Sequence, residues 1–282
     1  MPLILVAGTE QGAGATTLAV GLAHRIAYAG HAVTLVRLAG DPRAEGDAHL
    51  FATLDIAEAS GQPVAESALA ALTGIVVAEA PSDVDAAALA SRLGARLVLA
   101  GRVGAPAPSG STFIANHARA TAAGAIGEDR LLAAPSVAQI VAASGAKVLT
   151  RSIAGDSAIC EHILIGAISH DSNEPYFGRF VRKAVVTRSE RVDIVLSALR
   201  TETECLVLTG GTDPSPYILD RVASARGTTV LLAPEGTVET VRDIEGSFGR
   251  SAFAGEAKVE RISALMGEVI DDATLASLIT GS

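Results

Sequence analysis

Short runs of apolar residues alternate along this chain with longer alanine-rich segments whose apolar positions recur at helical spacing. In the first half, residues 3–7 predict a buried strand, residues 16–29 a helix and residues 32–38 a second strand. The same pattern predicts strands at 74–78, 96–100 and 112–115 and a helix at 84–93. Repeated strand–helix–strand units of this kind predict a doubly wound parallel sheet with helices on both faces.

A second set of elements begins after residue 130. Its predicted strands are 147–149, 162–168, 183–187, 205–209 and 229–233, and its predicted helices are 136–143, 191–200, 216–225 and 238–248. The tail over 257–279 is helical by pattern, with Asp271 and Asp272 as a break or cap. We therefore expect an α/β protein of two domains, a doubly wound domain over 1–130 and a smaller α/β domain over 131–282 that includes the tail.

Composition narrows the function classes. With 49% hydrophobic and 19% charged residues in 282, the chain has enough apolar surface to fold. A net charge of -9 and the lack of a Lys/Arg cluster argue against nucleic acid as a partner. The apolar runs are far shorter than the roughly 20 residues that span a membrane, and residues 1–4 show no secretory pattern. We expect a cytoplasmic protein with no membrane partner.

The two cysteines, Cys160 and Cys205, stand far apart in the sequence and at no metal-ligand spacing. A single cysteine in such a context is usually a small buried hydrophobe. We therefore assign neither cysteine any chemistry.

The first predicted strand leads into residues 8–17, GTEQGAGATT, and then into a helix. Glycines allow a tight turn in which backbone N–H groups converge on an anion at the helix start, and a hydroxyl there can hold a magnesium ion. The residues suited to these roles are Gly12, Gly14, Thr16 and Thr17. The segment therefore predicts a phosphate-binding loop.

The lysine expected after the last glycine of such a loop is replaced by Ala15, and the chain's lysines, at 147, 183 and 258, are all distant in sequence. That lysine neutralises charge on the β and γ phosphates, so its loss removes a main electrostatic contribution to phosphoryl transfer. Glu10 adds a negative charge beside the turn. We expect no competent ATP hydrolysis and name no catalytic residue. A remodelled loop on a retained fold is the alternative.

Residues 8–16 resemble the loop of dethiobiotin synthetases, in which GT is followed by acidic and polar residues and then GKT, with the lysine replaced here. By this resemblance Arg37 stands where the family has a substrate-binding lysine. Asp47 and Glu79 match the family's GDA and VEG carboxylates and would bind magnesium with Thr16, while Asn116 would contact adenine. The resemblance implies ATP or another nucleotide with Mg²⁺ as the ligand. For Asp47, a solvated loop carboxylate is the alternative.

Residues 183–194 and 205–211 resemble the DRTGG domain. The Asp-Arg pair appears here as Glu190-Arg191, and the turn Thr209-Gly210-Gly211 is intact. A strand followed by Thr-Gly-Gly and a helix that begins with proline makes a concavity with free N–H groups, which suits an anion, or simply a tight turn. Both interpretations are open, as is a purely structural ion pair for Arg191.

A dethiobiotin-synthetase-like domain followed by a DRTGG domain resembles the N-terminal region of long bacterial phosphate acetyltransferases. The resemblance implies a regulatory or ligand-sensing protein that binds a small anionic metabolite or a nucleotide and contacts a partner enzyme. We also expect a homo-oligomer. Two other functions remain open: an ATP-dependent ligase or kinase-like enzyme in which Arg37 or another arginine replaces the lysine, and a structural oligomerisation subunit.

Overall fold

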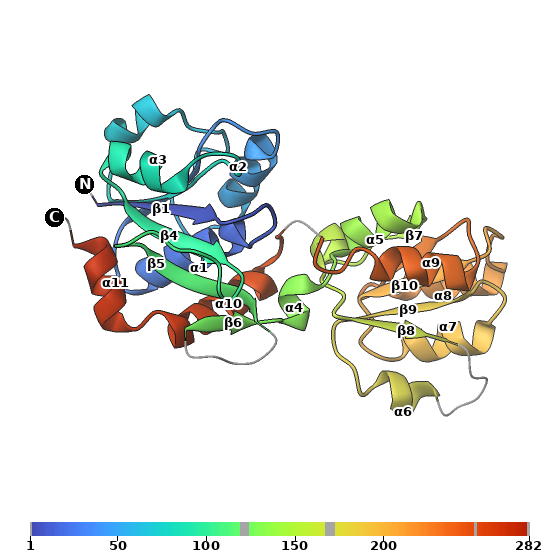
Figure 1. Ribbon diagram of the computed structural model, residues 1–282. Helices are drawn as coiled ribbons and strands as arrows, with labels where there is room; N and C mark the ends of the chain where they lie inside the picture. Colours follow the sequence, from blue (N-terminus) through green and yellow to red (C-terminus); the bar gives the residue numbers. More distant parts are fainter. Residues whose placement is uncertain (1, 119–123, 167–172, 251–252, 281–282) are drawn as a thin grey trace. The chain divides into compact units, whose positions relative to one another are not determined.

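The computed structural model describes residues 2–118, 124–166, 173–250 and 253–280 (Figure 1). The chain divides into two compact units. The first comprises residues 1–129 together with 256–282, and the second comprises residues 130–255. The C-terminal tail therefore belongs to the first unit, whereas the sequence pattern placed it in the second.

The first unit is built on a six-stranded sheet whose pairings are all parallel, in the order β2-β3-β1-β4-β5-β6. The strands are β1 (Leu3–Gly8), β2 (Val33–Arg37), β3 (Ile75–Glu79), β4 (Arg96–Gly101), β5 (Thr112–Ala118) and β6 (Ala125–Gly127). The helices are α1 (Ala15–Tyr28), α2 (Ala44–Thr53), α3 (Ala86–Leu93), α10 (Glu256–Val269) and α11 (Asp272–Ile279), with a 3-10 turn η1 (Glu66–Ala71). The predicted α/β class is confirmed.

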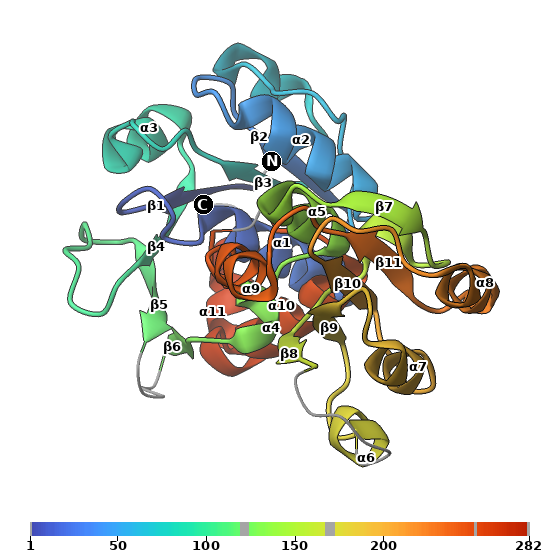
Figure 2. The same cartoon turned by 90° about the vertical axis from the view of Figure 1, so that its right-hand side faces the viewer.

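Helices cover both faces of this sheet, with α3 on one side and α1, α2, α10 and α11 on the other (Figure 2). Because both faces are covered, the central strand β1 is apolar at every position from Leu3 to Ala7, and all five side chains are buried. The loop that follows β1 therefore starts from a fully buried strand.

The tail joins the first unit through the packing of α10 on α1. Gly21 of α1 permits this approach, because a Cβ there would lie 2.8 Å from both Ile262 Cγ1 and Met266 Cγ. Both of those side chains are fully buried. Asp271 caps α11, as predicted, by accepting a hydrogen bond from the Thr274 N–H at 2.7 Å.

Three elements of the first unit escape the sequence pattern: α2, η1 and β6. Helix α2 has the sequence AEGDAHLFAT and buries only Ala44, Ala48 and Phe51, so its buried face is made mostly of small side chains and gives a weak periodic pattern. This helix is important for the site because it carries Asp47.

The second unit holds a five-stranded sheet in the order β7-β11-β10-β9-β8, in which β7 alone pairs antiparallel. Its strands are β7 (Lys147–Thr150), β8 (His162–Ile165), β9 (Lys183–Arg188), β10 (Cys205–Thr209) and β11 (Thr229–Leu232). Its helices are α4 (Arg130–Ala133), α5 (Val137–Ser144), α6 (Asn173–Phe177), α7 (Val192–Leu199), α8 (Pro216–Ser224) and α9 (Thr237–Glu245), with a 3-10 turn η2 (Gly155–Ser157). Of the strand predicted over 162–168, positions 167 and 168 lie outside the described residues.

A search of the described residues for a membrane-spanning helix gives a negative result, since none of their helices is both long and apolar enough to cross a bilayer.

Candidate functional site

The turn between β1 and α1 leaves backbone donors at the helix start. Gly12 and Gly14 have φ values of +79° and +94°, which side chains other than glycine rarely adopt. The first intrahelical bond of α1 runs from the Leu18 N–H to the Gly14 carbonyl at 3.0 Å. The N–H groups of residues 15–17 consequently have no acceptor within the helix, and Gly14 supplies no side-chain cap. This arrangement suits an anion.

Asn116 lies directly against this loop. Its Nδ2 donates to the Ala13 carbonyl at 3.0 Å, and its Oδ1 accepts from the His117 N–H at 2.9 Å. A Cβ on Gly14 would lie 2.1 Å from the same Nδ2, so glycine is required there for space as well as for conformation. The Asn116 amide thus fixes the loop backbone, and its proposed contact with adenine remains a prediction.

The negative charge of Glu10 is offset within the same unit. Arg102 Nε lies 2.7 Å from Glu10 Oε1, at the carboxyl end of β4. Both side chains are more than half exposed, so solvent screens the pair and its effect on stability is small. Glu10 therefore does not leave an isolated negative charge beside the loop.

The strand register directs Glu79 toward α1. Glu79 of β3 pairs with Val6 of β1 on one side and with Arg37 of β2 on the other, which places the three side chains on one face of the sheet. Helix α1 covers that face. Thr16 Oγ1 in its first turn donates to Glu79 Oε1 at 2.8 Å. The loop hydroxyl and the strand-end carboxylate are thus in direct contact.

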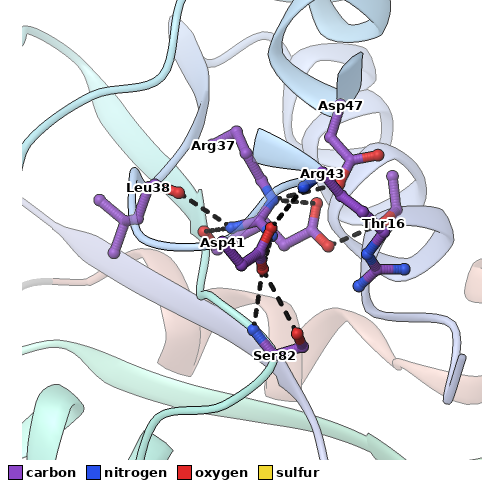
Figure 3. A network of polar contacts seen from close by, with 8 residues as sticks. Thr16, Arg37, Leu38, Asp41, Arg43, Asp47 and Ser82 are labelled. Carbon is purple, nitrogen blue, oxygen red and sulfur yellow. Dashed lines mark hydrogen bonds and ion pairs between the residues drawn. The ribbon is translucent and has the colours of Figure 1, made fainter. Parts of the chain in front are cut away.

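Arg37 occupies the centre of a polar cluster behind the loop (Figure 3). Its side chain is 0% exposed, and its Nε lies 3.2 Å from Asp47 Oδ2 and 3.7 Å from Glu79 Oε2. Another nitrogen of the same guanidinium pairs with Asp41, and Nη1 donates to the Leu38 carbonyl at 2.9 Å. The structure therefore brings together the predicted metal ligands Thr16, Asp47 and Glu79, but with an arginine between the two carboxylates.

This arrangement does not fit magnesium. Mg²⁺ requires oxygen ligands in an octahedron at roughly 2.0–2.1 Å. Here Asp47 and Glu79 face a guanidinium, and the described residues contain no group of three or more His, Cys, Asp or Glu side chains able to hold a metal ion. Asp47 is also not a solvated loop carboxylate, because it lies on α2 and pairs with Arg37. All three nitrogens of the Arg37 guanidinium are engaged within the cluster.

The charges of the cluster are tuned by burial and by hydrogen bonds. Burial raises the pKa of Glu79 to about 7, and the nearby Asp47 charge acts in the same direction, while Arg37 and Thr16 oppose the shift. Burial also raises the pKa of the Asp41 carboxyl, but hydrogen bonds from the Ser82 N–H and from Arg37 outweigh it and hold that pKa below its usual value. Near neutral pH, Arg37 thus balances ionised Asp41, and Glu79 is only partly ionised.

Arg43 is a residue of this site that sequence reasoning missed. Its backbone N–H donates to Asp41 Oδ1 at 2.9 Å, which holds the residue at the start of α2. Its exposed side chain lies on the same side of the cluster as Thr16 (Figure 3), and its charge acts to lower the pKa of Glu79. Within the described part of the chain, no carboxylate forms an ion pair with its guanidinium. No motif marks this position; its role depends on the Asp41 turn.

The Thr-Gly-Gly turn of the second unit does not have the free N–H groups that we expected. Gly210 and Gly211 have φ values of +94° and +65°, so glycine is needed at both positions. Their N–H groups donate to the carbonyls of Glu235 at 2.7 Å and Ala233 at 3.0 Å. The expectation of free donors was wrong, because a segment after β11 supplies acceptors that the local sequence does not reveal. Of the two open interpretations, the geometry favours a tight turn.

Glu190 and Arg191 take separate partners on the surface of the second unit. Arg191 binds both carboxylate oxygens of Asp193, at 3.0 Å and 2.8 Å, and Glu190 pairs with Arg188 at 3.3 Å. Thr209 Oγ1 lies 2.8 Å from Thr237 Oγ1. Each of these side chains therefore has a partner within the fold, and their binding of an anion remains a prediction.

Comparison with known proteins bears on the second unit. Residues 139–247 match the DRTGG domain, which confirms the resemblance seen in the sequence. The crystal structure of the CBS and DRTGG domains of the regulatory region of Clostridium perfringens pyrophosphatase, complexed with its activator diadenosine tetraphosphate, is similar at 19% identity with a TM-score of 0.36. The match covers 53% of this chain and 70% of that one.

Proposed function

We propose that this chain is a regulatory, ligand-sensing protein whose first unit binds a phosphate-bearing anion, such as a nucleotide, at the start of α1 and does not turn it over. The observation that carries the proposal is the contrast within the loop. The binding elements are kept, since the N–H groups of residues 15–17 have no helical acceptor. The catalytic elements are lost, since Ala15 replaces the lysine and Arg37 holds the two carboxylates.

The energetics agree with binding without turnover. A hydrogen bond from an N–H group to a charged phosphate oxygen contributes about 1.5–3 kcal/mol, so several such donors favour binding without any catalytic group. Phosphoryl transfer needs in addition a cation at the β and γ phosphates and bound magnesium to neutralise developing charge. Neither Ala15 nor a carboxylate already paired with Arg37 provides that.

The second unit supports a regulatory assignment. It carries the DRTGG domain, and its Thr-Gly-Gly turn and Arg191 are committed to internal contacts. We propose that this unit contacts a partner enzyme or a second copy of the chain, as the resemblance to the N-terminal region of phosphate acetyltransferases implies. Light scattering with and without a candidate enzyme measures both associations.

Calorimetric titration with ATP, ADP and AMP, alongside a phosphate-release assay, tests the proposal. We expect binding without phosphate release. Magnesium-dependent release that disappears in Thr16→Ala and Glu79→Gln would instead establish a ligase or kinase-like enzyme. If none of these nucleotides and no inorganic phosphate binds, the ligand-sensing function of the loop is rejected, and a structural oligomerisation subunit becomes the better account.

A further inference from the structure

We propose that the loop binds its phosphate-bearing ligand without a divalent cation, because Arg37 permanently takes the place of a metal between Asp47 and Glu79 while Arg43 provides the charge that meets the ligand. This inference rests on the proposed function of the loop and identifies the ligand of that site more closely. It predicts a preference for metal-free phosphates over magnesium–nucleotide complexes.

The burial of Arg37 makes its position permanent. The side chain is 0% exposed. Its nitrogens form ion pairs with Asp47, at 3.2 Å, and with Asp41, and donate a hydrogen bond to the Leu38 carbonyl at 2.9 Å. A metal between Asp47 and Glu79 would have to displace from both carboxylates a buried guanidinium that stays charged at any physiological pH. The two carboxylates that would attract a metal therefore already share a cation supplied by the chain itself.

A metal-free phosphate must also find a site that does not repel it. The carboxylate in contact with the first turn of α1 is Glu79, which accepts from Thr16 Oγ1 at 2.8 Å. Arg37 pairs with Asp41 and with Asp47 and its Nε lies 3.7 Å from Glu79 Oε2, so a buried cation stands among these carboxylates. This cation reduces the repulsion that the carboxylates exert on an anion, and the helix start offers its N–H donors.

Arg43 differs from other exposed arginines of the first unit. Arg92 pairs with Glu66 at 2.9 Å and Arg102 pairs with Glu10 at 2.7 Å. The guanidinium of Arg43 has no such carboxylate among the residues that the structure describes, although its backbone is fixed by Asp41. An arginine that is held in place and left unpaired beside an anion site is suited to bidentate recognition of phosphate.

The first experiment measures metal binding directly, with Mn²⁺ as the probe and electron paramagnetic resonance as the readout. We expect the wild-type protein to leave Mn²⁺ free in solution. Stoichiometric binding of Mn²⁺ by the wild type that is lost in Asp47→Asn would overturn the proposal. Arg37→Ala, which unmasks Asp41, Asp47 and Glu79, is expected to gain Mn²⁺ binding; if this variant does not fold, the wild-type titration still decides.

The second experiment titrates the whole protein with ATP in Mg²⁺ or in EDTA. We expect binding in EDTA at least as tight as in Mg²⁺. Arg43→Gln should weaken it about tenfold, the effect of losing one charge-assisted contact, whereas the control Arg92→Gln should leave it unchanged. Binding that requires Mg²⁺, or that survives Arg43→Gln, would overturn this inference and leave the proposed function standing. Absence of binding in both buffers would reject the proposed nucleotide site itself.

Discussion

Two buried lysines of the chain are accommodated in different ways. Lys183 Nζ donates to the carbonyl of Phe180 at 3.1 Å and to the carbonyl of Glu202. Lys258 Nζ is equally buried, but within the described part of the chain it has no hydrogen-bond partner. Burial lowers the pKa of Lys258 to about 8. An ammonium group that is neither solvated nor paired destabilises the folded state.

We therefore predict that Lys258→Met raises the free energy of unfolding at pH 7 by roughly 3 kcal/mol, from 1.36 kcal/mol per pKa unit. The folded pKa lies below the ordinary value of 10.5, so the wild-type penalty is complete below about pH 8 and disappears as the pH rises toward 10.5. Urea unfolding at pH 7 and at pH 10 checks both statements.

Lys183→Met is the matched control, and we expect it to be destabilising because it removes the donor of two hydrogen bonds to main-chain carbonyls. A Lys258→Met protein that is less stable than the wild type at pH 7 would show that Lys258 has a partner that the structure does not contain.

Glu79 should make the stability of the first unit depend on pH in the opposite direction from an ordinary acid. Its folded pKa of about 7 lies above the ordinary 4.5, so the proton stabilises the folded state. This contribution is complete below pH 4.5 and is lost as the pH rises through 7, by roughly 3 kcal/mol in all. We predict that Glu79→Gln removes this part of the pH dependence. Unfolding free energies at pH 5 and pH 8 measure it, with the exposed Glu66→Gln as control; an unchanged difference between the two pH values would contradict the prediction.

Part of the site could be predicted from single residues. The resemblance to dethiobiotin synthetases implied that Thr16, Asp47 and Glu79 lie close together, and the structure does bring them together around Arg37. The role of Arg37 could not be predicted, since it depends on the β2–β3 register and on the direction of its side chain. Similarly, Cys160 and Cys205 are distant in sequence, but both lie in the hydrophobic core of the second unit. The contact between their thiols and their burial raise the pKa of Cys160.

At the scale of elements, the pattern of apolar positions predicted where the strands lie better than it predicted which elements pack against each other. Most strands are apolar runs that both sheets bury, and their positions follow directly from the sequence. Helix α2 was missed because its buried face is made largely of alanine. The tail was correctly predicted to be helical, but an amphipathic pattern shows that a face is buried and not against which helix it packs. The close approach of Ile262 and Met266 to Gly21 identifies α1 as the partner of α10.

The α1–α10 contact gives a matched pair of glycine substitutions. In an open helix, Gly→Ala stabilises by about 0.5–1 kcal/mol, and Gly46 of α2 has nothing within 4 Å of an added Cβ. At Gly21 the same Cβ would lie 2.8 Å from two buried side chains, so overpacking outweighs helix propensity. We predict that Gly46→Ala is stabilising and that Gly21→Ala destabilises by about 1–3 kcal/mol. Denaturant unfolding measures both, and hydrogen exchange should show the loss of protection concentrated in α10.

If the Gly21→Ala and Gly46→Ala proteins had the same free energy of unfolding, α10 would be able to move away from α1 without cost. In that case the packing of the tail would contribute little to the first unit.

At the scale of the whole molecule, the second unit is an insertion within the first. The chain leaves the first unit after Asp129 and returns to it at Glu256, so the six-stranded sheet is complete before the helices that cover α1 have been reached. The DRTGG match over 139–247 lies wholly inside the inserted part. Folding of the first unit therefore requires contacts between residues more than 200 positions apart, such as Ser263 Oγ and His24 Nδ1 at 2.8 Å.

This connectivity predicts different fates for the two units in a chain that ends at residue 255. The second unit keeps all of its strands and both of its cores, so its amides should exchange as slowly as in the full chain. The first unit loses the helices that cover α1, including the buried Val259, Ile262 and Met266, so its amides should exchange faster throughout. Hydrogen exchange by mass spectrometry resolves the two sets of peptides in one sample. If β1 and β3 remained fully protected, the tail would be peripheral; if β9 and β10 also lost protection, the two units would form one cooperative structure.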